Sequence, residues 1–123
     1  MITKQLISAF ESLAPTYLAN DWDNVGLLVG SPEWRADNIL LTIDLTEAVL
    51  QEAIAMKANA IISYHPPIFS PLKSVTDSTF KERVVLDAIS HKIAIYSPHT
   101  SLDVAKGGVN DWKIGRASCR ERV

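Results

Sequence analysis

The sequence predicts an α/β fold in which a layer of parallel strands alternates with crossover helices. Three short apolar runs, at residues 39–43, 60–62 and 93–96, indicate strands, because continuous runs of Val, Ile and Leu are typical of strands buried on both faces. The two connecting segments are long enough for a helix and carry apolar residues at helical spacing. A strand–helix–strand–helix–strand order of this length favours parallel strands joined by right-handed crossovers.

The N-terminal residues predict one helix and one further strand. Thr3 is the expected N-cap of the helix, because its side-chain oxygen can accept a hydrogen bond from the first turn, and Pro15 limits the end. The apolar face of this helix consists of Leu6, Ile7, Phe10 and Leu13. Residues 25–29 form a short apolar run between Gly and Asn/Asp signals, which predicts a strand. The preceding Trp22-Asp23-Asn24 is expected to be a structural turn.

Each crossover helix begins at a threonine. Thr46 is the expected N-cap of the first, whose buried stripe consists of Val49, Leu50, Ala53 and Ile54. Thr79 and Glu82 have the T-x-x-E spacing of a capping box at the start of the second. Its predicted apolar face consists of Phe80, Val84, Val85, Ala88 and Ile89. A loop that contains several prolines, residues 66–77, joins the second buried strand to this helix.

The composition excludes several classes of protein. With 47% hydrophobic and 21% charged residues, the 123-residue chain has the balance of a globular domain. A net charge of −2 without a basic run argues against direct nucleic-acid binding, and no apolar run is long enough to cross a bilayer. The single Cys allows neither an internal disulfide nor a C-x-x-C metal site. No targeting segment is visible, so a cytoplasmic location is expected.

The C-terminal residues do not continue the pattern of the domain. Residues 107–112 look like the start of a helix, but the segment that follows has three Arg and no apolar stripe. Its last ten residues, IGRASCRERV, resemble one reading frame of a common sequencing adapter. We therefore interpret residues 1–112 as an N-terminal α/β half-domain and residues 113–123 as a non-native sequencing or cloning scar. A natural basic tail is the alternative, and under the scar interpretation residues 113–123 should lack packed contacts.

Polar residues that can carry chemistry follow the three predicted parallel strands. Ligands of open parallel sheets bind beyond the carboxyl ends of the strands. Asp44, His65, His99 and Asp103 occupy these positions. Imidazole is the commonest metal ligand, and Pro66 restricts the backbone of His65 to extended geometry. The alternative for His65 is a hydrogen bond to the following loop.

The other residues at this edge have structural alternatives too. Asp103 can bind a divalent ion or cap the glycine-rich turn that follows it, and Asp44 can orient a histidine, bind a water or cap the helix near Thr46. Tyr64 is a weak metal ligand, because its phenol has an ordinary pKa of about 10, and otherwise packs or donates a hydrogen bond. His99 on its own favours a structural role, holding its loop to the sheet. No serine-hydrolase, P-loop or dinucleotide motif is present.

Three stretches of sequence together resemble a known family. They are residues 22–27 (WDNVGL), residues 63–69 (SYHPPIF), and residues 97–100 (SPHT) leading to Asp103 and the GVN at 108–110. In this order and spacing they resemble the N-terminal half of the NGG-interacting-factor-three-like family, also called the GTP cyclohydrolase type-two family. The resemblance runs from Met1 to Trp112 and is closest to the eukaryotic branch.

The resemblance implies an α/β fold of two related halves, with two divalent metal ions, zinc or similar, between them. It assigns metal-ligand roles to His65 and Asp103, and the remaining ligands, a His and a Glu, would lie near the C-terminus of a longer protein. Bacterial members have two adjacent histidines where this chain has Tyr64 and His65. The resemblance also implies homo-oligomers. A chain with two strong ligands is expected to bind metal weakly and to be inactive by itself.

Two functions compete at this point. The first is a metal-dependent hydrolase, in which two metals activate water and polarise the substrate. The second is a non-catalytic transcriptional co-regulator that acts through protein partners, as eukaryotic relatives are described, with a nuclear as well as a cytoplasmic location. The replacement of a histidine by Tyr64 favours the second modestly. The residues identify neither substrate nor partner.

Overall fold

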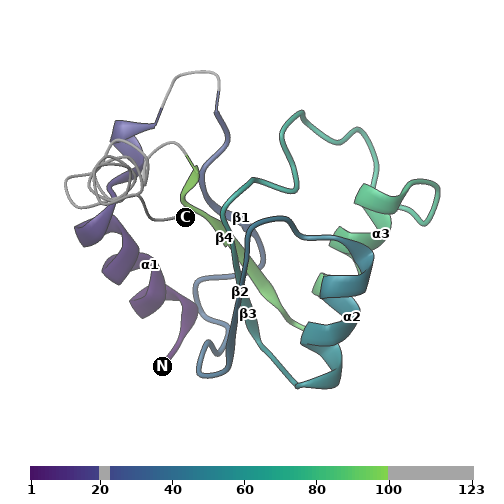
Figure 1. Ribbon diagram of the computed structural model, residues 1–123, viewed down its shortest axis with the longest axis horizontal. Coiled ribbons are helices and arrows are strands. Elements are labelled where there is room, and N and C mark those ends of the chain that lie inside the picture. The colour runs from purple at the N-terminus through teal and green to yellow at the C-terminus, as the bar shows by residue number, and fades with distance from the viewer. Residues whose placement is uncertain (20–22, 100–123) are drawn as a thin grey trace, which may run out of the picture.

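A four-stranded sheet with the strand order β1-β4-β3-β2 separates two helical layers in the computed structural model (Figure 1). The structure describes residues 1–19 and 23–99. Its strands are β1 (Gly26–Val29), β2 (Ile39–Thr42), β3 (Ala60–Ser63) and β4 (Ala94–Ser97). Its helices are α1 (Thr3–Leu13), the 3-10 helix η1 (Thr16–Leu18), α2 (Glu47–Ala55) and α3 (Phe80–Ser90). Asp103 and the scar predicted at 113–123 lie outside the described residues.

The parallel layer predicted from the sequence is confirmed for three strands. β3 pairs in parallel with β2 on one side and with β4 on the other, and α2 and α3 are the crossovers. β1 is a strand where the sequence predicts one, but it pairs antiparallel with β4. Residues 30–38 contain no helix, and a loop of this length is too short for the crossover that parallel strands need. The chain therefore reverses direction between β1 and β2.

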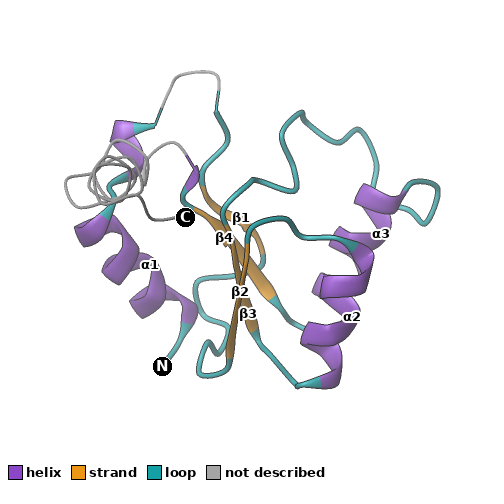
Figure 2. Cartoon of the chain, viewed as in Figure 1, coloured by secondary structure: helices purple, strands orange, loops and turns teal. Residues whose placement is uncertain are grey.

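The two faces of the sheet are covered differently (Figure 2). α2 and α3 pack side by side on one face, over a core that includes Leu50, Ile61 and Ile95. α1 lies against the other face, where Leu6 contacts a smaller cluster with Ile62 and Tyr96. The β2 end of this face is less covered, since Leu41 is 73% exposed and Ile43 is 62% exposed.

The helix N-caps are partly as predicted. Thr46 and Thr79 each accept a hydrogen bond from the third helical residue, Val49 and Glu82. Thr3 is not the N-cap of α1, because Ile2 occupies that position and Thr3 is buried with its hydroxyl donating to the Trp34 carbonyl. A tertiary contact with the loop between β1 and β2 has thus taken the threonine away from the capping role.

Some residues of the predicted apolar faces lie at the surface. Leu13 of α1 and Phe80 and Ile89 of α3 are about half exposed, whereas Leu6, Leu50, Ala53, Val84, Val85 and Ala88 are buried as predicted. The exposed residues lie at or near the helix ends. No helix in the described ranges is both long and apolar enough to span a membrane.

Glycine is required at the end of β1. Gly30 has a φ of +108°, and an added Cβ would lie 3.0 Å from the Trp34 ring and 3.1 Å from the Ala94 Cα. Both the left-handed backbone and the close approach favour a residue without a side chain.

Two residues after each crossover helix ends, a lysine lies in the left-handed region, with φ of 57° at Lys57 and 52° at Lys92. The N–H of each lysine and the N–H of the residue after it bond back to carbonyls of the last helical turn, an arrangement that usually has glycine at the lysine position.

Lys92→Gly should stabilise the protein by about 0.5–1 kcal/mol, because relief of backbone strain outweighs the added freedom of the unfolded chain. Urea unfolding measures this. Lys81→Gly, within α3, is the control and should destabilise by about 1 kcal/mol; a loss of stability in Lys92→Gly would contradict the argument.

Glu82 ties the loop before α3 to the helix. Its carboxylate accepts hydrogen bonds from the hydroxyls of Thr79, Ser74 and Thr76, and these lower its pKa below the ordinary 4.5. A lowered folded-state pKa stabilises the fold above the unfolded-state pKa, and this contribution is lost as the pH falls through the folded-state value. Glu82→Gln should therefore lower the melting temperature at about pH 7 and weaken its fall between about pH 5 and pH 3. Glu52→Gln, on the exposed side of α2, should keep the acid dependence of the unaltered chain.

Candidate functional site

The three parallel strands end in a row of hydroxyl residues, Thr42, Ser63 and Ser97. Thr42 pairs with Ser63, and the register of β3 with β4 places Ser97 next in the row. Thr42 Oγ1 donates to the Asp44 carbonyl at 2.8 Å, and Ser63 Oγ donates to the His65 carbonyl at 2.7 Å. Ser97 Oγ donates to the Tyr64 carbonyl at 3.1 Å. Ser63 and Ser97 are fully buried, so this edge of the sheet is held by short bonds to the chain that leaves it.

Asp44 and His65 form a hydrogen-bonded pair just beyond this row. Asp44 Oδ1 lies 2.6 Å from His65 Nδ1. The pair is open to solvent, with side-chain exposures of 66% and 48%. Helix α2 starts three residues after Asp44, but Thr46 rather than Asp44 caps it. Of the roles open to Asp44 from the sequence, the structure shows the contact to a histidine.

His99 makes a second pair, with Asp23. Its Nδ1 lies 2.9 Å and 3.0 Å from the two Asp23 carboxylate oxygens. This pair is buried, with side-chain exposures of 18% for His99 and 0% for Asp23. His99 has a φ of 22°, an uncommon value for a residue with a side chain. The contact joins the chain entering β1 to the chain leaving β4.

Tyr64 brings the two histidine rings into one cluster. Its ring centroid lies 5.0 Å from that of His65 and 5.3 Å from that of His99, and the two imidazole centroids lie 5.2 Å apart. The contacts of His99 with Tyr64 and with His65 are edge-on, with interplanar angles of 85° and 80°. Tyr64 therefore packs against two imidazoles that also contact each other and are each held at Nδ1 by a carboxylate.

Four of the five site residues predicted from the sequence lie at one edge of the sheet, namely Asp44, Tyr64, His65 and His99. Asp103 is outside the described residues. Within the part of the chain that the structure describes, no three His, Cys, Asp or Glu side chains form a metal-binding group. The metal roles of His65 and Asp103 stay predictions.

Asp23 is the site residue that sequence reasoning assigned to a structural turn. Its carboxylate does accept the N–H of Asn24, and the Asn24 amide donates to the Ile68 carbonyl. Its contact with His99, however, spans 76 residues of sequence. The sequence offered one indication of this contact, a carboxylate just before the start of a strand, and that pattern is too common to identify a site residue.

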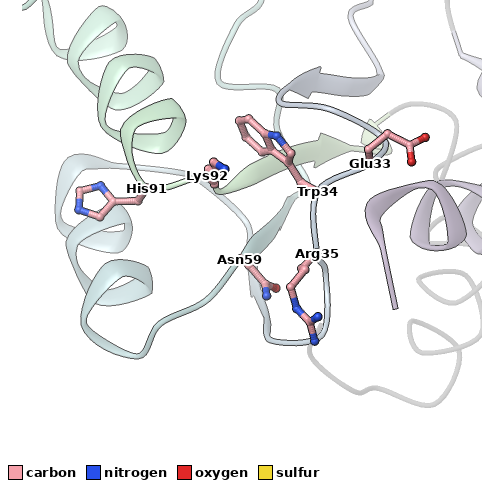
Figure 3. Close-up of a pocket in the computed structure, with 6 residues that line it drawn as sticks. All are labelled: Glu33, Trp34, Arg35, Asn59, His91 and Lys92. Atoms are coloured by element: carbon pink, nitrogen blue, oxygen red, sulfur yellow. The ribbon is translucent and has the colours of Figure 1, made fainter.

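A cavity of about 330 Å³ lies at the opposite edge of the sheet. Figure 3 shows that the side chains of Glu33, Arg35 and His91 point away from one another there. Arg35 is paired with Asp37, and His91 Nδ1 is bonded to the Asp87 carbonyl. The polar groups of this cavity do not converge on a ligand. The cluster of histidines and carboxylates lies instead at the edge where the parallel strands have their carboxyl ends.

The comparisons with known proteins agree with one another. A family model described as Duf34/NIF3 (NGG1p interacting factor 3) matches residues 1–120. The chain is 53% identical over 108 residues to NIF3-like protein 1 of Drosophila melanogaster, covering 87% of this chain and 37% of that protein. It is 40% identical over 108 residues to the GTP cyclohydrolase 1 type 2 homolog of Bacillus subtilis, covering 88% of this chain and 29% of that one.

A solved structure shows the same fold. The Bacillus cereus protein related to NIF3 superposes with a TM-score of 0.83 and 42% identity, covering 90% of this chain and 30% of that chain. The chain thus spans about a third of the length of the curated relatives it matches.

The two histidine–carboxylate pairs should differ in their contribution to stability. His99→Ala removes the imidazole from a fully buried carboxylate, which should destabilise the protein by about 3 kcal/mol. His65→Ala breaks a pair that water screens and should cost less than about 1 kcal/mol. Urea unfolding of the two variants side by side measures the difference. Equal losses would show that burial does not separate the pairs.

Proposed function

This chain belongs to the Duf34/NIF3 family, and on this premise we propose that it is the part of a divalent-metal-binding protein that supplies His65 and Asp103 as ligands. The observation that carries the proposal is the exposure of the His65 imidazole together with its contact to a carboxylate. It stands half exposed at the carboxyl edge of a parallel sheet, with Nδ1 held by the Asp44 carboxylate. Carboxylate, imidazole and metal in this order are a recurrent arrangement in metalloproteins.

The residues present fit a metal such as zinc. Imidazole nitrogen and carboxylate oxygen are both ligands of Zn²⁺, and Nε2 of His65 makes no hydrogen bond within the described ranges. The metal would supply a Lewis acid and an activated water. His65 would bind it, Asp44 would hold the imidazole in place, and Asp103 would provide a second ligand.

Hydrolysis is the reaction class that we propose for the longer protein. One relative is named a GTP cyclohydrolase 1 type 2 homolog, and two metals that share a site can activate water and polarise a carbonyl or phosphoryl group. Since the chain spans about a third of its relatives, further ligands would come from the remaining length of such proteins. The chain on its own would therefore bind metal weakly and be inactive.

A protein-interaction function is the second candidate. Leu41 of β2 is 73% exposed and Ile43, just after the strand and next to Asp44, is 62% exposed. Exposed apolar residues that cluster mark interaction surfaces. Tyr64 also supports it, because a phenol is a poor substitute for a metal-binding imidazole. Under this proposal the protein forms homo-oligomers and binds protein partners that act in transcription. It would do so in the cytoplasm and the nucleus.

Metal content of the full-length protein distinguishes the two candidates. We expect protein purified without added metal to contain bound divalent metal by elemental analysis, and His65→Ala to lose most of it, since a ligand is removed. His91→Ala is the matched control, because His91 is also exposed but lies at the end of α3, at the opposite edge of the sheet. No metal in the unaltered protein, or equal metal in His65→Ala, would refute the metal function and leave the interaction function.

A further inference from the structure

We propose that Asp44 is a positioning residue that fixes the tautomer of His65, so that Nε2 is the nitrogen a divalent cation binds. The inference rests on the proposed metal function and names the residue that prepares its ligand. A carboxylate only accepts hydrogen bonds, so the 2.6 Å contact places the proton of a neutral imidazole on His65 Nδ1. The lone pair then belongs to Nε2, and metals bind the unprotonated nitrogen.

The backbone brings the two groups together. Hydrogen bonds between the two chains continue past the ends of β2 and β3, since the N–H of Tyr64 donates to the Thr42 carbonyl and the N–H of His65 to the Ile43 carbonyl, both at 3.0 Å. The hydroxyls of Thr42 and Ser63 then bond the carbonyls of Asp44 and His65. The backbone of His65 is thus held by both kinds of hydrogen bond and that of Asp44 by the bond to its carbonyl, so both side chains leave from defined backbone positions.

The second imidazole of the cluster uses the same nitrogen. His99 Nδ1 faces the Asp23 carboxylate at 2.9 Å, on a different pair of strands. Both histidines at this edge thus use Nδ1 to bond an aspartate of the protein, which leaves Nε2 as the nitrogen for a ligand. The function of Asp44 is then to orient His65, as Asp23 orients His99.

Stability does not explain the Asp44–His65 pair. With exposures of 66% and 48%, its electrostatic attraction is screened by water, and pairs of this kind contribute little to folding. Capping does not explain it either, because the Thr46 oxygen receives the N–H of Val49 at the start of α2. An Asp44 variant should therefore fold normally and change only the state of the imidazole.

The test measures the tautomer directly. Long-range ¹H–¹⁵N correlation spectra of the metal-free chain, at about pH 8.5 where ordinary imidazole is neutral, report which nitrogen of His65 is protonated. We expect Nδ1–H in the unaltered chain and a shift towards Nε2–H in Asp44→Ala and Asp44→Asn. Glu52→Gln removes an exposed carboxylate from α2 and should leave the His65 signals unchanged. Zn²⁺ titration followed at the same signals should give a Kd about 10–100-fold higher in the Asp44 variants.

The outcomes separate this inference from the proposed function. An Nε2–H tautomer of His65 in the unaltered chain, or an unchanged tautomer in Asp44→Ala, overturns the positioning role whatever the metal affinity. An unchanged Kd for Zn²⁺ in the Asp44 variants overturns it as well. If the unaltered chain does not bind Zn²⁺, the metal function fails for this chain, and the tautomer of His65 alone decides whether Asp44 positions it.

Discussion

The register of β2, β3 and β4 fixes the positions from which Asp44, Tyr64 and His65 enter the candidate site. Because Thr42 pairs with Ser63 and the N–H of His65 bonds to the Ile43 carbonyl just beyond, the ends of β2 and β3 are level with each other. Three hydroxyls along this row bond the departing chain, which takes Asp44, Tyr64 and His65 away from the sheet at defined positions. A slip of one residue would turn each of these side chains to the other face. The chemistry of the edge thus depends on backbone pairing more than on contacts between side chains.

The antiparallel edge strand β1 brings the Asp23 carboxylate to the site. β1 pairs with β4 in the opposite direction, so the residues that precede β1 lie beside those that follow β4. This places the buried Asp23 carboxylate against His99. A carboxylate without solvent needs a hydrogen-bonding partner, and the imidazole provides one. The pair consequently links the N-terminal part of the chain to the site and holds His99 in a backbone conformation that it would rarely adopt alone.

The two imidazole–carboxylate pairs have different physical roles despite their similar geometry. The Asp23–His99 pair is buried, so its interaction is strong and serves the fold. The Asp44–His65 pair is exposed, so its interaction is weak and affects chiefly the proton position of the ring. Tyr64 contacts both rings, whose centroids lie 5.2 Å apart. The buried pair thus joins the chain entering β1 to the chain leaving β4, while the exposed pair remains accessible from solvent.

Local patterns in the sequence determined the parallel layer and the edge where the chemistry lies. Continuous apolar runs identified the three parallel strands, and threonine caps identified α2 and α3. The prediction of burial on both faces is confirmed for β3 and β4 but wrong for β2, where Leu41 is exposed because β2 is the edge strand and α1 does not cover it. Parallel strands end on the same side, which was enough to place Asp44, His65 and His99 together. Only the tertiary structure decided the direction of β1, the burial of Thr3 and the pairing of Asp23 with His99. The physical reason is range: periodicity and capping depend on neighbours within a few residues, whereas the contact between Asp23 and His99 joins groups 76 residues apart, brought together only when β1 closes the sheet.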